Sequence, residues 1–148
     1  MQEPGARSRG RGLRIPRALY EEIVAHGQSR YPKEACGLLA GPADGAWRAV
    51  QVYPMRNVED SPVGYSMDPP QQLRVEQQMR SRSQRLIAIY HSHTASAAYP
   101  SPVDVNRAIS PDVSYVLVSL QDQGHPVVRS FRIDGAAIAE EPITVNDL

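Results

Sequence analysis

Two histidines separated by one residue, His91 and His93, are candidate ligands of a metal ion. A carboxylate follows at Asp104, so the chain offers two nitrogen ligands and one oxygen ligand of the kinds that Zn²⁺ takes. Three protein ligands leave a fourth position for water, which is typical of a catalytic zinc site rather than a structural one. These residues therefore predict one zinc ion, with a bound water, per chain.

The elements that must position these ligands can be predicted from the neighbouring sequence. Residues 86–90 are apolar and β-prone, which predicts a short buried strand. If this strand continues through His93, the alternation of side chains places residues 91 and 93 on the same face. Both imidazoles would then reach one ion.

Asp104 lies in a segment that is typical of a helix start. Ser101 stands directly before Pro102, with the acid three residues after the serine, so a short helix is expected over about 102–109. Taken alone, this pattern would indicate only a capped helix. Together with the paired histidines, it would deliver Asp104 on a rigid first turn that faces the end of the strand.

This set of residues resembles the motif of the JAMM metalloproteases, whose domain is called MPN. The motif joins an upstream Glu, here Glu34, to His-Ser-His and, after seven residues, to Ser-x-x-Asp; no element is missing. The resemblance extends over about 13–145 to the actinobacterial peptidases that act on a ubiquitin-like sulfur carrier with a C-terminal cysteine. The segments that carry it are 34–42, 90–95, 98–101, 115–119 and 129–133.

The resemblance implies a role for each residue of the motif. His91, His93 and Asp104 would hold Zn²⁺, which lowers the pKa of its water toward about 7 and polarises the scissile carbonyl. Glu34 would move the proton as general acid–base, and Ser101 would stabilise the oxyanion. From the residues alone, Glu34 could instead be a solvated helix end, although the apolar run that follows it predicts partial desolvation.

Four residues around the motif could support it. Ser92 and Thr94 flank the ligands and are expected to orient them. Tyr65 and Tyr99 could line a substrate groove, although a tyrosine in a loop often serves only packing. These residues define the expected surroundings of the metal site.

Three other reactive side chains are expected to take no part in metal binding or catalysis. Cys36 stands in an apolar strand and reads as core rather than as a ligand or nucleophile. His26 and His125 have no partner at ligand spacing and are expected to be solvent-exposed. Because there is one cysteine, no internal disulfide can form, which fits a reducing cytoplasm.

The 148 residues are expected to form one domain, over 13–148, after a disordered arm over 1–12. Formal net charge is zero, but residues 1–17 hold five Arg and one Glu, so the rest of the chain carries net charge −4. The net negative charge of residues 18–148 gives no reason to expect nucleic-acid binding. The arm lacks the apolar region of a signal peptide, and no stretch is long enough to span a bilayer.

The coarse pattern alternates helices and strands, which predicts an α/β or α+β fold with mostly antiparallel strands. The resemblance implies a single MPN domain, a curved mixed β-sheet flanked by helices, with an architecture like that of cytidine deaminases. Helices are expected over 16–30 and 68–82, and strands over 36–41, 47–53, 86–93, 114–120, 127–133 and 136–141.

The function that the resemblance implies is cleavage after the Gly-Gly tail of a small ubiquitin-like sulfur carrier, which releases cysteine. A cysteine synthase is then a possible further partner, and the sequence gives no oligomeric state. One alternative is a protease for another ubiquitin-like protein, for example in a siderophore pathway, and another is a non-catalytic MPN scaffold. A zinc deaminase would need Pro-Cys-x-x-Cys, which a single cysteine excludes.

Overall fold

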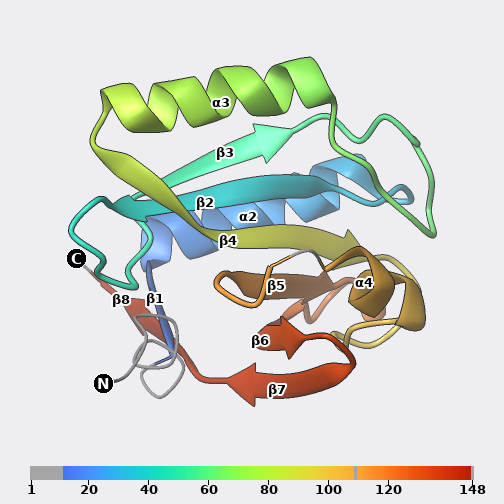
Figure 1. The fold of residues 1–148 in the computed structure, drawn as a ribbon. Coiled ribbons are helices and arrows are strands. Elements are labelled where there is room, and N and C mark those ends of the chain that lie inside the picture. The colour runs from blue at the N-terminus through green and yellow to red at the C-terminus, as the bar shows by residue number, and fades with distance from the viewer. Residues whose placement is uncertain (1–11, 109, 148) are drawn as a thin grey trace.

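The computed structural model describes residues 12–108 and 110–147, which are built around one six-stranded mixed sheet (Figure 1). All neighbouring strands are antiparallel except β4 and β5, which are parallel. In spatial order the strands are β3 (Gln51–Met55), β2 (Cys36–Pro42), β4 (Gln84–His93), β5 (Ser114–Ser119), β6 (Val127–Asp134) and β7 (Ala137–Glu141). The predicted fold class, a mixed sheet flanked by helices, is confirmed.

Two long helices cover opposite faces of this sheet (Figure 1). Helix α2 (Arg17–Arg30) follows Pro16, as the sequence predicted, and buries Ile23 and Gly27 against one face. Helix α3 (Pro69–Ser81) has proline at its first position and buries Val75 and Met79 against the other face. The two apolar cores therefore lie on either side of the sheet.

Toward its carboxyl end, strand β4 alternates between these two cores. Tyr90 belongs to the core under α2, whereas Ile89 packs against the core under α3. His91 and His93 continue the face of Ile89 because side chains alternate along a strand. The predicted common face of the two histidines is thus built by the strand itself.

The structure corrects several predicted elements. The strand expected over 47–53 begins only at Gln51, because the backbone before it pairs with Arg14. The Arg14 N–H donates to the Trp47 carbonyl at 3.2 Å, and the Ala49 N–H donates to the Arg14 carbonyl at 2.9 Å. Two further strands, β1 (Leu13–Pro16) and β8 (Ile143–Asn146), form a separate parallel pair that the sequence did not predict. Each has only four residues and depends on a partner about 130 residues away, so no local pattern marks it.

The remaining short helix, α4 (Pro102–Arg107), lies where the sequence predicted it but ends earlier. Residue 109, the predicted end, lies outside the described residues, as do residues 1–11 of the predicted N-terminal arm. In the described part of the chain, no helix is both long and apolar enough to cross a membrane.

Candidate metal centre and active site

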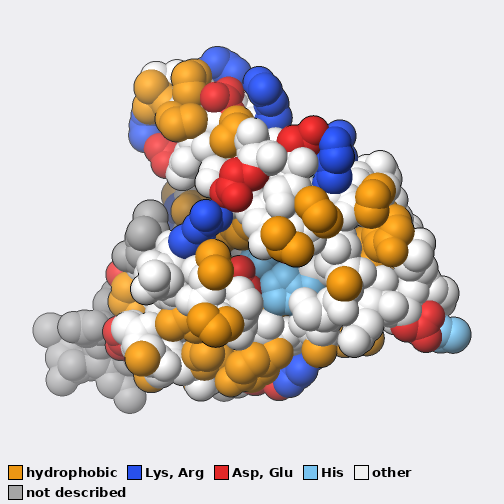
Figure 2. Space-filling model, turned by 90° about the vertical axis from the view of Figure 1, so that its right-hand side faces the viewer, with side chains coloured by type: hydrophobic (Ala, Val, Ile, Leu, Met, Phe, Trp, Pro, Cys, Tyr) orange, Lys and Arg blue, Asp and Glu red, His pale blue; other side chains and the backbone are white. Residues whose placement is uncertain are grey.

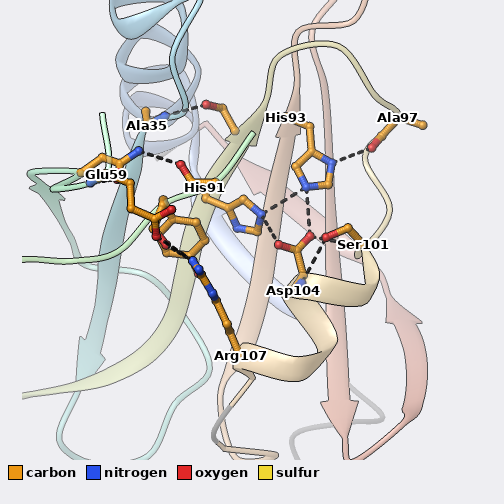
Figure 3. Close-up of polar contacts among 12 residues, drawn as sticks. Ala35, Glu59, His91, His93, Ala97, Ser101, Asp104 and Arg107 are labelled. Carbon is orange, nitrogen blue, oxygen red and sulfur yellow. Dashed lines mark hydrogen bonds and ion pairs between the residues drawn. The ribbon is translucent and has the colours of Figure 1, made fainter. Parts of the chain in front are cut away.

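The three predicted ligands meet at the carboxyl end of β4 (Figure 3). Nε2 of His91 lies 3.2 Å from Nε2 of His93. The two carboxylate oxygens of Asp104 lie 3.1 Å from the first of these nitrogens and 3.0 Å from the second. The side chains are 4%, 5% and 13% exposed in this order, so the cluster is largely shielded from solvent.

The spacing of these atoms can be compared with that of a zinc site. In a tetrahedral site with bonds of about 2.0–2.2 Å, neighbouring ligand atoms lie roughly 3.3–3.5 Å apart. The separations of 3.0 to 3.2 Å among His91, His93 and Asp104 are close to this. Two imidazole nitrogens and one carboxylate oxygen also leave a fourth position. The donor set and its spacing fit a catalytic zinc ion.

A capping box at the start of α4 fixes Asp104. The Asp104 N–H donates to Ser101 Oγ at 3.1 Å, and the Ser101 N–H donates to the Asp104 carboxylate at 2.9 Å. Burial alone would raise the pKa of Asp104, but hydrogen bonds from His91, His93 and the Ser101 N–H hold it well below its usual range. Asp104 is therefore ionised at neutral pH, as a ligand must be.

The two histidines are also held in ligand geometry. Nδ1 of His93 lies 2.9 Å from the carbonyl oxygen of Ala97. A carbonyl only accepts, so Nδ1 carries a proton. Nε2 shares a proton with Asp104 in the metal-free protein, and loss of that proton would leave its lone pair for a metal ion. The ring of Tyr65 stacks on His91 with centroids 4.5 Å apart. Burial lowers the pKa of His91, which favours the neutral form that binds metals.

Glu34 precedes β2 and lies beside this centre, because Cys36 of β2 pairs with His91 of β4. Its side chain is only 6% exposed, as the apolar run after it predicted. Burial raises the pKa of Glu34 to about 7, and the nearby charge of His93 partly offsets that rise. A carboxylate that titrates near neutral pH is suited to accept and return a proton.

The residues that flank the ligands reach the loops rather than the imidazoles. The hydroxyl of Ser92 accepts a hydrogen bond from the N–H of Ala35 at 2.8 Å, and the Ser92 N–H donates to the Ala35 carbonyl at 3.0 Å. Ser92 thus ties the ligand strand to the neighbour of Glu34. Thr94 donates to the carbonyl of Pro62 at 3.0 Å, which ties the strand end to the following loop.

A groove of about 290 Å³ opens onto the centre and is lined by Glu34, His93 and Ser101. Its walls include two exposed apolar side chains, Val63 at 84% and Val103 at 51%. Figure 2 shows histidine surface at the bottom of a hollow between hydrophobic side chains. An extended peptide could therefore reach the ligands along an apolar channel.

Arg107 is a residue of this site that the sequence analysis missed. It lines the groove, pairs with Glu59 at 2.8 Å and donates to the backbone carbonyl of Tyr65, so it joins α4 to the loop opposite. The sequence could have indicated Arg107, because it lies three residues after Asp104, one turn along the same helix.

The structure separates the two tyrosines that were expected to line the groove. Tyr65 lines the groove, whereas Tyr99 is half exposed and packs edge-on against Phe131 with centroids 5.4 Å apart. Cys36 is buried in the core, and His125 is exposed, both as predicted. The prediction that His26 is solvent-exposed was wrong.

His26 is half-buried because α2 turns it toward the sheet. Its Nδ1 lies 2.7 Å from the hydroxyl of Tyr90, with which it forms a cross-element hydrogen bond. Burial lowers the pKa of His26. Sequence spacing could not show this contact, because the two residues are far apart along the chain.

Comparison with known proteins places these residues in a family. Residues 16–134 match the family described as prokaryotic homologs of the JAB domain. The chain is 46% identical over 127 residues to the CysO-cysteine peptidase of Mycobacterium tuberculosis, covering 86% of each protein. It is 39% identical over 97 residues to a probable TtuB-protein conjugate cleaving protease of Thermus thermophilus, covering 65% of this chain and 63% of the relative.

Solved structures have the same architecture. A protein from Desulfitobacterium hafniense superposes with a TM-score of 0.84 at 37% identity, over 92% of this chain and 94% of that one. A JAB1/MPN domain protein from Archaeoglobus fulgidus gives 0.60 at 16% identity, over 90% and 99%, which shows a shared fold. With its sequence match over most of its length and this fold, the chain belongs to the prokaryotic JAB (JAB/MPN) domain family.

Proposed function

We propose that this protein is a zinc peptidase that cleaves after the C-terminal Gly-Gly of a small ubiquitin-like sulfur carrier and releases cysteine. One observation carries the proposal: the ligand cluster His91, His93 and Asp104 lies beside a buried carboxylate, Glu34, that titrates near neutral pH. The similarity to a CysO-cysteine peptidase over 86% of each protein supports the choice of substrate.

The residues divide the work of hydrolysis among them. Zn²⁺ held by His91, His93 and Asp104 would supply a Lewis acid that polarises the carbonyl and lowers the pKa of water. Glu34 accepts the proton of the attacking water and returns it to the amine that leaves as the C–N bond breaks. Ser101 uses its hydroxyl oxygen as an acceptor in the capping box, so its proton is available to the developing oxyanion.

The groove favours an extended tail without side chains next to the cleaved bond. Val63, Val103 and Tyr65 form part of its wall. Gly-Gly has no side chains to clash there, and an extended backbone is a common mode of peptide recognition. Replacing either Gly of the tail by a bulky residue should suppress cleavage, whereas the identity of the released residue should matter less.

The test uses a synthetic carrier that ends in Gly-Gly-Cys, incubated with zinc-loaded enzyme and followed by mass spectrometry. The expected result is loss of one cysteine mass, abolished by a chelator and restored by added zinc. An intact carrier with a zinc-loaded enzyme would rule out this substrate.

A second candidate is removal of a ubiquitin-like protein from lysine side chains. It is favoured by the similarity to the probable conjugate-cleaving protease of Thermus thermophilus. The matching substrate is a carrier joined through Gly-Gly to the ε-amine of a lysine peptide. Faster hydrolysis of this isopeptide than of the Gly-Gly-Cys carrier would favour the second candidate. Lack of any chelator-sensitive hydrolysis would favour a non-catalytic scaffold.

A further inference from the structure

A second cavity, of about 460 Å³, adjoins the groove, and Glu34 lines both. It is lined by the last turns of α2, by the residues just before β2, and by the end of β3 with the segment that follows it. Two buried apolar residues, Ala35 and Met55, contribute to its lining. The metal-ligand candidates and Ser101 do not line this cavity, so the mechanism above assigns it no role.

The lining of this cavity includes an arginine that is not paired with a carboxylate of the described residues. Arg30 and Lys33 share a single carboxylate, Asp60, at 3.0 and 2.6 Å. Arg56 also lines the cavity, is exposed and makes no ion pair with any residue that the structure describes. Two arginines and two carboxylates, Asp60 and Glu34, line the cavity, and Arg30 and Lys33 already share Asp60. Arg56 is therefore the cation of the lining that is available to an anion.

The position of Glu34 determines which part of a substrate reaches this cavity. Glu34 returns the proton to the leaving amine, so the residue that carries this amine must lie against it. The acyl side of the substrate occupies the groove with Ser101 and His93. The leaving residue would then occupy the adjoining cavity. There, Ala35 and Met55 suit an uncharged side chain, and Arg56 suits a free carboxylate.

We infer that this cavity binds the released residue and that Arg56, assisted by Arg30, holds its free α-carboxylate. The inference rests on the proposed function and adds a substrate class: a single C-terminal residue, rather than a lysine within a protein, on the leaving side. A lysine within a protein has no free α-carboxylate, so Arg56 would not strengthen the binding of a lysine isopeptide. The guanidinium can bind both oxygens of a carboxylate, which a lysine ammonium cannot do in the same geometry.

The experiment compares two carriers, one that ends in Gly-Gly-Cys with a free carboxylate and one with the same cysteine as its amide. The expected result for the wild type is about tenfold higher kcat/KM on the free acid, the usual scale of a hydrogen-bonded charge pair. Arg56→Ala should remove most of the preference for the acid, because only Arg30 is then left to contact the carboxylate. Arg56→Lys should keep part of the preference.

Arg74→Ala is the matched control, because Arg74 is an exposed arginine of α3 outside this cavity. Arg56 can be replaced without loss of its backbone contact, since only its N–H donates to Gln71, at 2.9 Å. Equal cleavage of acid and amide by the wild type would overturn the assignment and leave the proposed function intact. Cleavage of neither carrier by zinc-loaded enzyme would instead remove the proposed function.

Discussion

His93 uses its two ring nitrogens for different purposes, Nδ1 for the carbonyl of Ala97 and Nε2 for the ligand cluster. His93→Ala removes one of three ligands, so we expect zinc content well below one per chain after dialysis, by metal analysis. His125→Ala is the control, because the side chain of that histidine is 85% exposed and pairs with Asp122, away from the ligand cluster. Full zinc retention by His93→Ala would contradict the ligand assignment.

Glu34 is expected to act in the chemistry and not in metal binding. Glu34→Gln keeps the size of the side chain but cannot accept the proton of water, so kcat should fall by about 10²–10⁴-fold. Zinc content should remain at the wild-type level, measured on the same sample. A variant that cleaves at nearly the wild-type rate would assign Glu34 a structural role.

The raised pKa of Glu34 also predicts how stability changes with pH in the metal-free protein. The folded pKa of about 7 exceeds the ordinary 4.5, so the folded state binds more protons than the unfolded state between these values. Its contribution to stability is complete below pH 4.5 and is lost as pH rises to 7. Above this window the loss is on the order of 3 kcal/mol at most.

Glu34→Gln removes this group and should be more stable than the wild type at pH 8 but not at pH 4.5. Urea unfolding of the two metal-free proteins at both pH values measures the difference. A constant difference across the window would show that Glu34 does not titrate differently on folding.

At the scale of elements, β2 and β4 pack so closely that only glycine fits at one position. A Cβ at Gly37 would lie 2.2 Å from the ring of Tyr90, which is 1% exposed and bonded to His26. Gly37→Ala should destabilise the protein by at least about 1–3 kcal/mol, measured by urea unfolding. Gly124→Ala, where the nearest atom is 3.6 Å away, should change little; equal effects would contradict the packing argument.

The elements that the sequence predicted well have local causes. Strand β4 and helix α4 follow from an apolar run and from the pattern Ser101-Pro102 with Asp104. Strands β1 and β8 pair with each other across nearly the whole chain, so local sequence carries no sign of them. The strand predicted over 47–53 begins late because the backbone of Trp47 and Ala49 pairs with the distant Arg14.

At the scale of the molecule, the ligand set joins two elements, β4 and α4, which do not come together in an unfolded chain. A metal that binds only the folded state stabilises it by about 2.7 kcal/mol when its free concentration is 100 times Kd. For a chain of this size we expect Tm to fall by roughly 5–10 °C when a chelator removes the zinc. Calorimetry with and without chelator measures this shift. If the chelator lowers the Tm of His93→Ala by the same amount, the metal responsible binds at another site.

The sequence by itself determined the ligands, because His91, His93, Ser101 and Asp104 lie within 14 residues and their relations follow from strand alternation and helix capping. It also determined the sheet-and-helix fold class, because periodicity is local. Only the tertiary structure decided what surrounds the ligands. Glu34 approaches them through the pairing of β2 with β4, and Ser92 turns out to hold Ala35 instead of an imidazole. Such contacts depend on register and burial between distant segments, which local residue spacing does not specify.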